Sequence, residues 1–331
     1  MNLLAGDVGG TKTSLAIYAL GRGVHDPLAV RTVRSADYPD LESAVLAFLA
    51  DTGLRVSRAS IGVAGPVVDG VTTATNLPWQ VSIAGFQQRL GLESFCLLND
   101  LEAIAYAIPV LTADDLVTLN EGYPEAQGTV AILAPGTGLG EGYLTWTGTG
   151  WKALPSEGGH GDFAPNGPLQ QKLLAYMSER VGHVSWERVC SGLGMANLYA
   201  FCRDERLAPE PDWLRSKVAA ADDPTPVIVA HATDSAAPEP LCRAALELFL
   251  AILGAEAGNM YLRLLSPGGV YLAGGIPPRI VDELRRPSFL EAFLAKGRLS
   301  HVVARAPLRI VMRPDVGLLG AAAYGQSHWE A

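Results

Sequence analysis

The sequence predicts an α/β protein of two domains, because strand and helix patterns alternate through the first hundred residues and a strand, a glycine-rich turn and a second strand occur twice along the chain. The apolar run Leu3-Leu4-Ala5 leads into the turn GDVGGTKT at 6–13, and a strand-like run follows at 14–18. The segment 130–144 repeats this plan around APGTGLG. A glycine turn between two strands makes a tight hairpin, unlike the strand-to-helix turn of a Rossmann fingerprint or a P-loop.

The first hundred residues alternate strand and helix patterns, with strands expected near 3–7, 13–20, 59–64 and 95–98. Asp40 is placed to cap a helix with an apolar stripe through Leu41, Val45 and Phe48. A second helix is expected from Leu101 until Pro109 ends it.

The longer second region carries the second hairpin, a glycine-rich loop at 156–162, helices through 167–207 and a long helix near 240–264. Loops and short helices are expected at 208–240. A strand at 269–273 leads through glycines into what we expect to be a helix started by Pro277. The small residues of 316–324 predict a final helix that packs tightly, which we expect to return to the N-terminal domain.

Composition restricts the class of function. The chain has 331 residues, 49% of them hydrophobic, which is enough for the cores of two domains. A net charge of -9 without a run of Lys or Arg argues against nucleic-acid binding. Four charged residues interrupt the longest apolar stretch, 241–265, so no membrane span is predicted. The N-terminus lacks a basic segment, so we expect no signal peptide and a cytoplasmic location.

The four cysteines give no sign of a zinc site or a disulfide framework, because they are widely separated and include no Cys-x-x-Cys pair.

The two hairpins are candidate phosphate sites. Their glycines let backbone N–H groups approach an anion, Thr11 adds a hydroxyl donor, and the Asp7 carboxylate is a candidate for hydrated Mg²⁺. One such turn alone is more simply an ordinary hairpin. A second copy favours binding of a nucleoside polyphosphate.

Asn99 and Asp100 stand where a strand ends and a helix begins. Both residue types are favoured N-caps, so helix capping explains them without any chemistry. The functional alternative is that Asp100 acts as a general base at the carboxyl end of a strand, where α/β proteins place ligands.

The loop SEGGHGDF at 156–163 combines Glu157 and His160 with three glycines, which leave room for a ligand near the backbone. The alternative is that Glu157 and His160 simply pair with each other. The local sequence favours a solvated helical residue at Glu187. The turn at Asn76-Leu77-Pro78-Trp79 fits either the wall of a sugar site or a structural turn.

Taken together, these segments resemble the bacterial glucokinases of the proteobacterial type, within the hexokinase, Hsp70 and actin superfold. The resemblance runs through GDVGGTK at 6–12, TNLPW at 75–79, LNDLEAIAYAIPVL at 98–111, APGTGLGEGYL at 134–144, PSEGGHGDFAP at 155–165, ERVCSGLGMANLY at 187–199, LAGGIPPR at 272–279 and GLLGAAA at 317–323.

The resemblance implies a two-domain actin-like ATPase (ribonuclease H-like) fold with a nucleotide and sugar cleft between the domains. We expect a smaller α/β domain of residues 1–109 plus about 301–331 and a larger α+β domain of residues 110–300. We also expect a homodimer.

The resemblance further implies ATP-dependent phosphorylation of D-glucose at the 6-hydroxyl, with Asp100 as general base. Glucose would be bound by Asn99, Asp100, Glu157, His160 and Glu187. The phosphates of Mg-ATP would be held by Gly6, Asp7, Val8, Gly9, Gly10, Thr11, Gly136, Thr137 and Gly138, with Asp7 reaching Mg²⁺ through water. Gly274 and Gly275 would lie near the adenosine.

Lys12 departs from the family, which usually has Asn at this position; related ROK sugar kinases often have Lys there. The clustered cysteines of the ROK zinc site are absent. Three alternatives stay open: a kinase for another hexose or amino sugar, a polyphosphate-using enzyme, which the lack of a basic tract disfavours, and a catalytically silent sugar sensor.

Overall fold

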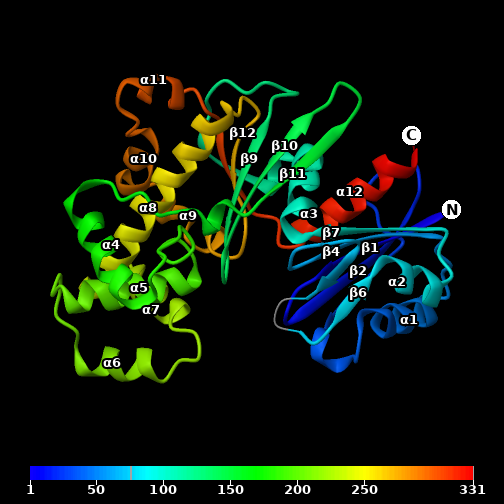
Figure 1. Cartoon of the computed structure of the whole chain (residues 1–331), viewed down its shortest axis with the longest axis horizontal. Helices are drawn as coiled ribbons and strands as arrows, with labels where there is room; N and C mark the ends of the chain where they lie inside the picture. Colours follow the sequence, from blue (N-terminus) through cyan, green and yellow to red (C-terminus); the bar gives the residue numbers. More distant parts are fainter. Residues whose placement is uncertain (75–76, 331) are drawn as a thin grey trace. The chain divides into compact units, whose positions relative to one another are not determined.

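The structure is a computed structural model that describes residues 1–74 and 77–330 (Figure 1). Asn76 of the predicted sugar-site turn lies outside the described residues. The chain forms two compact units. The first comprises Met1–Asp115, Leu144–Pro155 and Arg313–Ala331, and the second comprises Leu116–Tyr143 and Ser156–Met312.

The first unit contains a five-stranded sheet in the order β3-β2-β1-β4-β7. Its strands are β1 (Asn2–Val8), β2 (Lys12–Ala19), β3 (Ala29–Arg34), β4 (Arg58–Val63) and β7 (Ser94–Asn99). The first three pair antiparallel, whereas β4 runs parallel to both β1 and β7. A separate ribbon joins β5 (Val71–Thr73) to β6 (Gln80–Ser82). The carboxyl ends of β1, β4 and β7 therefore lie at one edge of the sheet.

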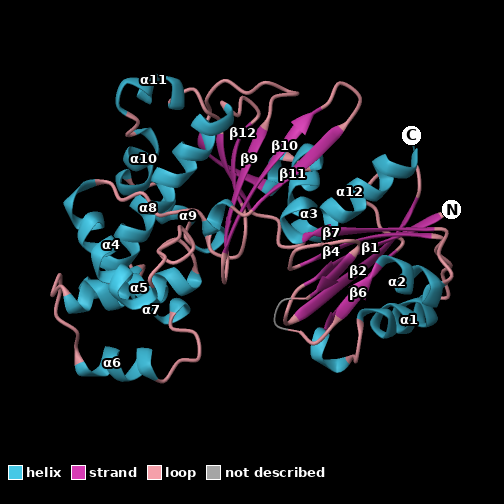
Figure 2. Cartoon of the chain, viewed as in Figure 1, coloured by secondary structure: helices cyan, strands magenta, loops and turns pink. Residues whose placement is uncertain are grey.

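Helices cover both faces of this sheet (Figure 2). On one face α1 (Leu41–Thr52) and α2 (Ile83–Leu90) contribute Val45, Phe48 and Phe86 to a core cluster with β1, β2 and β4. On the other face α3 (Asp100–Ala107) packs against α12 (Val316–Glu330), which also contacts β1 and β4. Asp40 caps α1 as predicted, because its Oδ1 accepts a hydrogen bond from the Ser43 N–H at 2.7 Å.

A second sheet has the order β11-β10-β9-β12-β13-β8. Its strands are β8 (Leu116–Asn120), β9 (Val130–Pro135), β10 (Leu139–Trp146), β11 (Trp151–Ser156), β12 (Gly269–Leu272) and β13 (Leu308–Val311). β12 is parallel to β9 and β13, and β8 closes the edge antiparallel to β13.

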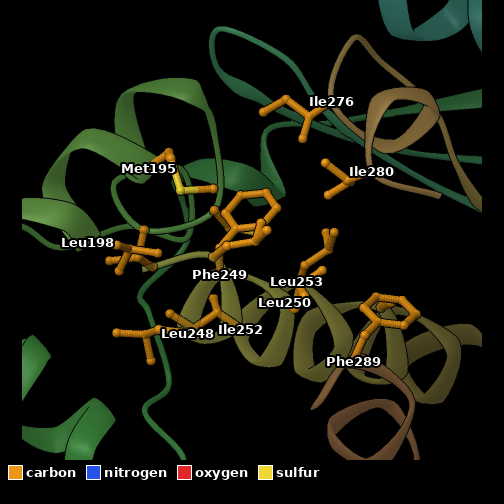
Figure 3. Packing of buried hydrophobic residues seen from close by; sticks show 14 of the residues in the cluster. Met195, Leu198, Leu248, Phe249, Leu250, Ile252, Leu253, Ile276, Ile280 and Phe289 are labelled. Atoms are coloured by element: carbon orange, nitrogen blue, oxygen red, sulfur yellow. The ribbon is translucent and has the colours of Figure 1, made fainter. Parts of the chain in front are cut away.

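The helices of the second unit enclose a hydrophobic core that includes Met195, Phe249 and Phe289 (Figure 3). They are α4 (Gly167–Val181), α5 (Gly192–Asp204), α6 (Asp212–Ala219), α7 (Thr225–Ala232), α8 (Pro240–Leu264), α9 (Val281–Leu284), α10 (Pro287–Leu294) and α11 (Ser300–Val303). Because α5, α7 and α10 all pack on α8, its buried side chains surround the helix.

The two sheets repeat one plan. In each, an antiparallel hairpin is followed, beyond its first strand, by two parallel strands: β1-β4-β7 in one and β9-β12-β13 in the other. The turn GDVGGTK joins β1 to β2, and PGTG joins β9 to β10. The predicted duplicated hairpin is confirmed, together with the α/β class.

Two expectations differ from the structure. The sequence missed β3, an edge strand whose alternating burial is weak. The helix expected from Pro277 is a 3₁₀ turn, η5 (Pro277–Arg279), followed by the four-residue α9. Two successive prolines remove two backbone donors, and Ile280 leaves helical geometry at φ -127°.

Glycines permit the closest contacts between elements. A Cβ added to Gly320 of α12 would lie 1.6 Å from the Ala103 carbonyl oxygen of α3, and one added to Gly254 of α8 would lie 2.2 Å from the Phe289 carbonyl oxygen of α10. Neither neighbour is a side chain that could rotate away, so any larger residue must separate the two helices.

Replacing Gly320 by Ala should therefore lower the free energy of unfolding by more than about 2 kcal/mol, because the clash is with backbone. Urea denaturation monitored by circular dichroism measures this loss. Gly150→Ala is the matched control, since a Cβ there meets nothing within 4 Å. Equal stability of the two variants would contradict the proposed packing of α12 on α3.

Candidate active site

The predicted site residues fall into two groups, one in each compact unit. The first unit holds the turn 6–11 together with Asn99 and Asp100. The second unit holds 136–138, Glu157, His160, Glu187 and the pair Gly274-Gly275.

The turn between β1 and β2 is braced by a residue that sequence reasoning missed. Ser35 is fully buried, and its hydroxyl donates to the Gly9 carbonyl oxygen at 3.0 Å. Its hydroxyl also lies 3.0 Å from that of Thr13, and its N–H donates to the Thr11 carbonyl at 3.1 Å. The turn closes internally through a bond from the Gly9 N–H to the Lys12 carbonyl at 3.0 Å. Nothing in the sequence marks Ser35, because it is 24 positions or more from the turn it holds at Gly9 to Thr11.

Two of the predicted phosphate residues serve the core. The Val8 side chain is buried, and a Cβ on Gly6 would lie 3.1 Å from Ile61 and 3.2 Å from Leu15. Both residues lie in the central strand β1, which pairs with β2 on one side and β4 on the other. Lys12, by contrast, is exposed and lies directly across the strand pair from the exposed Arg34.

Asp7 is in an electrostatically unfavourable position. Burial, the charge of Asp100 and the charge of Asp315 together raise the pKa of the Asp7 carboxyl to about 6. The first turn of α12 lies close by, since a Cβ on Gly317 would be 2.8 Å from the Asp7 carboxyl carbon. Neighbouring carboxylates that repel one another form an environment suited to a cation.

Within the described part of the chain, no group of three or more His, Cys, Asp or Glu side chains is arranged to ligate a metal directly. Asp7 is the residue of the first turn that the sequence predicts to bind hydrated Mg²⁺.

Asn99 and Asp100 occupy different positions at the start of α3. Asn99 is the N-cap of α3: its Oδ1 accepts from the Leu101 N–H at 2.8 Å, and its Nδ2 donates to the Gly65 carbonyl at 2.9 Å. Glu102 completes the capping box by accepting from the Asn99 N–H at 2.9 Å. Asp100 is the first residue of α3, directly after the carboxyl end of β7. Asp100 Oδ1 also accepts from the Leu101 N–H, at 2.9 Å, so the two side chains share this donor, whereas the capping box is formed by Asn99 and Glu102.

Backbone hydrogen bonds join three predicted segments of the second unit. The Glu187 N–H donates to the Gly159 carbonyl at 2.9 Å, and the Trp186 N–H donates to the Gly161 carbonyl at 3.0 Å. The Gly192 N–H donates to the Gly136 carbonyl at 2.8 Å. The glycine hairpin, the loop 157–161 and the segment 186–192 are therefore held together as one assembly.

Glu187 has a structural contact within this assembly. Its Oε2 accepts from the Leu139 N–H at 3.0 Å, and a Cβ on Gly138 would lie 2.4 Å from the same oxygen. Gly138 does not have a positive φ, so the close neighbour of a larger residue there would be the Glu187 carboxylate, which a Cβ would displace. Glu187 is not the solvated helical residue of the alternative interpretation.

Glu157 and His160 lie at the surface of the assembly. Their side chains are 77% and 62% exposed, and Glu157 Oε2 is 4.0 Å from His160 Nε2. Such a distant and exposed contact contributes little, so pairing alone does not explain the two residues. Three residues of their loop form the 3₁₀ turn η4 (Gly158–His160).

Gly274 and Gly275 have different surroundings. Gly274 has φ +81°, and a Cβ there would lie 2.7 Å from the Pro135 carbonyl oxygen. Gly275 would meet nothing within 4 Å, which leaves its surroundings open.

The whole chain matches one family model. The glucokinase family model covers residues 4–328. The chain belongs to the glucokinase family.

The chain is similar to known glucokinases over nearly the full length of both sequences. It is 39% identical to a glucokinase from Synechocystis, covering 97% of each chain. The crystal structure of a glucokinase from an Antarctic psychrotroph has a TM-score of 0.83 at 31% identity, covering 98% of each chain. The fold is shared with a ROK family glucokinase from Streptomyces griseus in complex with glucose and AMPPNP, with a TM-score of 0.62, 20% identity and coverage of 98% and 99%. The actin-like fold class is thus confirmed.

No helix among the described residues of this family member is both long and apolar enough to cross a membrane.

Replacing Asp7 by Asn should stabilise the protein above pH 7. The folded-state pKa is raised from 3.8 to about 6, so ionised Asp7 destabilises the fold progressively as pH rises through that window and fully above it. Asn cannot ionise, so its advantage should be absent near pH 4 and reach about 1–3 kcal/mol at pH 8. Thermal melts at both pH values measure it, with exposed Asp26→Asn as the control. A variant less stable than the wild type at pH 8 would refute this electrostatic account.

Proposed function

We propose that this member of the glucokinase family transfers the γ-phosphoryl group of ATP to the 6-hydroxyl of D-glucose, with Asp100 as the general base. The observation that carries the proposal is the family match across residues 4–328. The position of Asp100 supports it, since ligands in α/β proteins bind beyond the carboxyl ends of strands.

Asp100 accepts the proton of the 6-hydroxyl in the proposed reaction. The hydroxyl oxygen then forms a bond to the γ-phosphorus, the bond from that phosphorus to the β,γ-bridging oxygen breaks, and ADP leaves with the electron pair. Since phosphoryl transfer has a loose transition state, positioning and electrostatics supply most of the acceleration, and the base adds about 10²–10⁴-fold.

The two glycine hairpins bind the phosphates in this proposal. Because the Gly9 N–H closes its own turn, we assign the contacts in the first hairpin to Gly10 and Thr11. Asp7 holds Mg²⁺ through water, and the bound ion would neutralise charge on the phosphate oxygens. Gly136, Thr137 and Gly138 form the second phosphate contact, and the open surroundings of Gly275 support a role next to the adenosine.

Glucose hydroxyls are bound by Glu157, His160 and Glu187 in the proposed complex, with Asn99 and Asp100. The exposure of Glu157 and His160 supports this role, because neither has a strong internal partner. Glu187 has one oxygen engaged by Leu139, and a carboxylate accepts several hydrogen bonds.

Assays of turnover with ATP and different sugars test two other functions. A kinase for another hexose or amino sugar would prefer that sugar in a coupled assay with ATP, and a catalytically silent sensor would show no turnover. The expected homodimer is tested by sedimentation at assay concentrations.

Replacing Asp100 by Asn separates catalysis from capping. Asn99 provides the cap, so Asp100→Asn should change stability by less than about 1 kcal/mol while kcat falls about 10²–10⁴-fold. Asn99→Ala is the matched comparison and should cost about 1–2 kcal/mol of stability. Thermal melts and steady-state kinetics on the same preparations measure both. A folded Asp100→Asn protein with near-normal kcat would exclude Asp100 as the base.

Replacing Glu157 by Gln tests the sugar site. A site that pairs sugar hydroxyls loses affinity when an acceptor becomes a donor, so KM for glucose should rise at least about tenfold while KM for ATP stays within about twofold. Glu179→Gln, a change at an exposed carboxylate of α4, is the control. An unchanged KM for glucose would remove Glu157 from the site.

A further inference from the structure

A buried cluster of charged side chains in the second unit has no part in the proposed chemistry. Glu141 of β10 and Glu256 of α8 are 1% and 0% exposed. Arg263 Nη1 lies 2.6 Å from Glu256 Oε1 but 3.4 Å from Glu141 Oε2. Glu256 is the better satisfied of the two, because Asn259 Nδ2 also donates to its Oε2 at 2.9 Å.

Glu141 is left incompletely paired. Among the described residues its buried Oε1 has no hydrogen-bond partner. An ionised carboxylate is costly in such a place. Burial, followed by the charge of Glu256, accordingly raises the pKa of Glu141 well above its usual value, and Arg263 opposes the rise only in part.

Glu141 lies directly against the loop that carries Glu157 and His160. A Cβ on Gly158 would be 2.2 Å from Glu141 Oε2, so the loop backbone rests on this carboxyl group. The next glycine, Gly159, is equally close to β10: a Cβ there would be 2.1 Å from the Leu139 carbonyl oxygen. The loop position therefore depends on what β10 presents beneath it.

We propose that Glu141 is a positioning residue for sugar binding: its carboxyl group, held by Arg263, supports Gly158 and so keeps Glu157 and His160 in place. This inference rests on the proposed sugar-binding role of those two residues. Glu141 touches neither substrate in this account. It acts only through the loop.

A dependence on pH follows from the groups that face Glu141. Tyr143 lies on its own strand, Glu256 and Arg263 come from α8, and Cys190 precedes α5. Lys296, which follows α10, is bonded instead to Asn259 Oδ1 at 2.8 Å and the Ala255 carbonyl at 2.7 Å.

Arg263 is thus the one cation in contact with Glu141 among the described residues. When Glu141 loses its proton, the new charge repels Glu256 and lies on a carboxyl group whose Oε1 already lacks a partner, which displaces the support beneath Gly158. The raised pKa means that this effect is absent at low pH and appears as pH rises through the folded-state value.

The test is the pH dependence of KM for glucose at saturating ATP. In the wild type KM for glucose should rise several-fold on the alkaline side. Glu141→Gln resembles the neutral acid in size and shape, so its KM at neutral pH should stay within about twofold of wild type and the alkaline rise should vanish. Glu141→Ala removes the support, so KM for glucose should rise about tenfold with little change in kcat or in KM for ATP.

Glu283→Ala is the matched control. Glu283 is also a buried carboxylate of the second unit, but it pairs with Arg243 and Arg286. Its loss should lower stability without changing KM for glucose. An alkaline rise that persists in Glu141→Gln, or a Glu141→Ala protein with the kinetics of Glu283→Ala, would overturn the inference. If Glu141→Ala does not fold, the Gln variant alone decides.

Glu157→Gln, measured in parallel, separates this inference from the proposed function. If that change leaves KM for glucose unaltered, the sugar-site assignment fails. If it raises KM while the Glu141 variants behave as wild type, only the positioning role fails.

Discussion

Close approach of backbone to backbone at glycine is the constraint on which the rest of this structure depends. Gly320 brings α12 onto α3, Gly254 brings α10 onto α8, and Gly159 brings the loop 157–161 onto β10. In each case a Cβ would lie within about 2.2 Å of a carbonyl oxygen, closer than real Cβ atoms come. Such contacts place elements accurately because neither side can rotate out of the way.

Carboxylates are concentrated against this rigid frame in both units. Asp7 lies near Asp100 and Asp315 in the first unit, and Glu141 lies near Glu256 in the second. Both arrangements raise the pKa of a buried carboxyl group, which lowers the stability of the ionised fold. Clusters of this kind persist where function requires them, and the one around Asp7 is at the proposed phosphate site.

The repeated strand order explains how two similar turns arise at equivalent places. In each sheet the glycine turn follows the first strand of the hairpin, β1 or β9. A strand parallel to it, β4 or β12, lies on its other side. The supports differ between the copies. Ser35 braces the turn after β1, whereas Gly192 and Glu187 hold the turn before β10.

The α/β class, the two glycine hairpins, the cap at Asp40 and the extent of α8 could all be predicted from the sequence, because each depends on local periodicity or on a short motif. The candidate ligand-binding residues were likewise predicted from motifs, through the resemblance to the family. The sequence does not predict the edge strand β3, because its residues are only partly buried. At Pro277 the sequence predicts a helix where the structure has a 3₁₀ turn, because a helix start and a 3₁₀ turn share the same sequence signals.

The contacts that these residues make with other elements are visible only in the folded structure. Ser35 lies under a turn that is distant in sequence, Glu187 accepts from Leu139, and Glu141 supports Gly158. The division of roles between Asn99 and Asp100 likewise required the hydrogen bonds of the N-cap. These contacts join residues from separate elements, and their distances depend on packing that no local pattern encodes. Periodicity specifies the elements, but side-chain partners are set by where the folded chain brings those elements together.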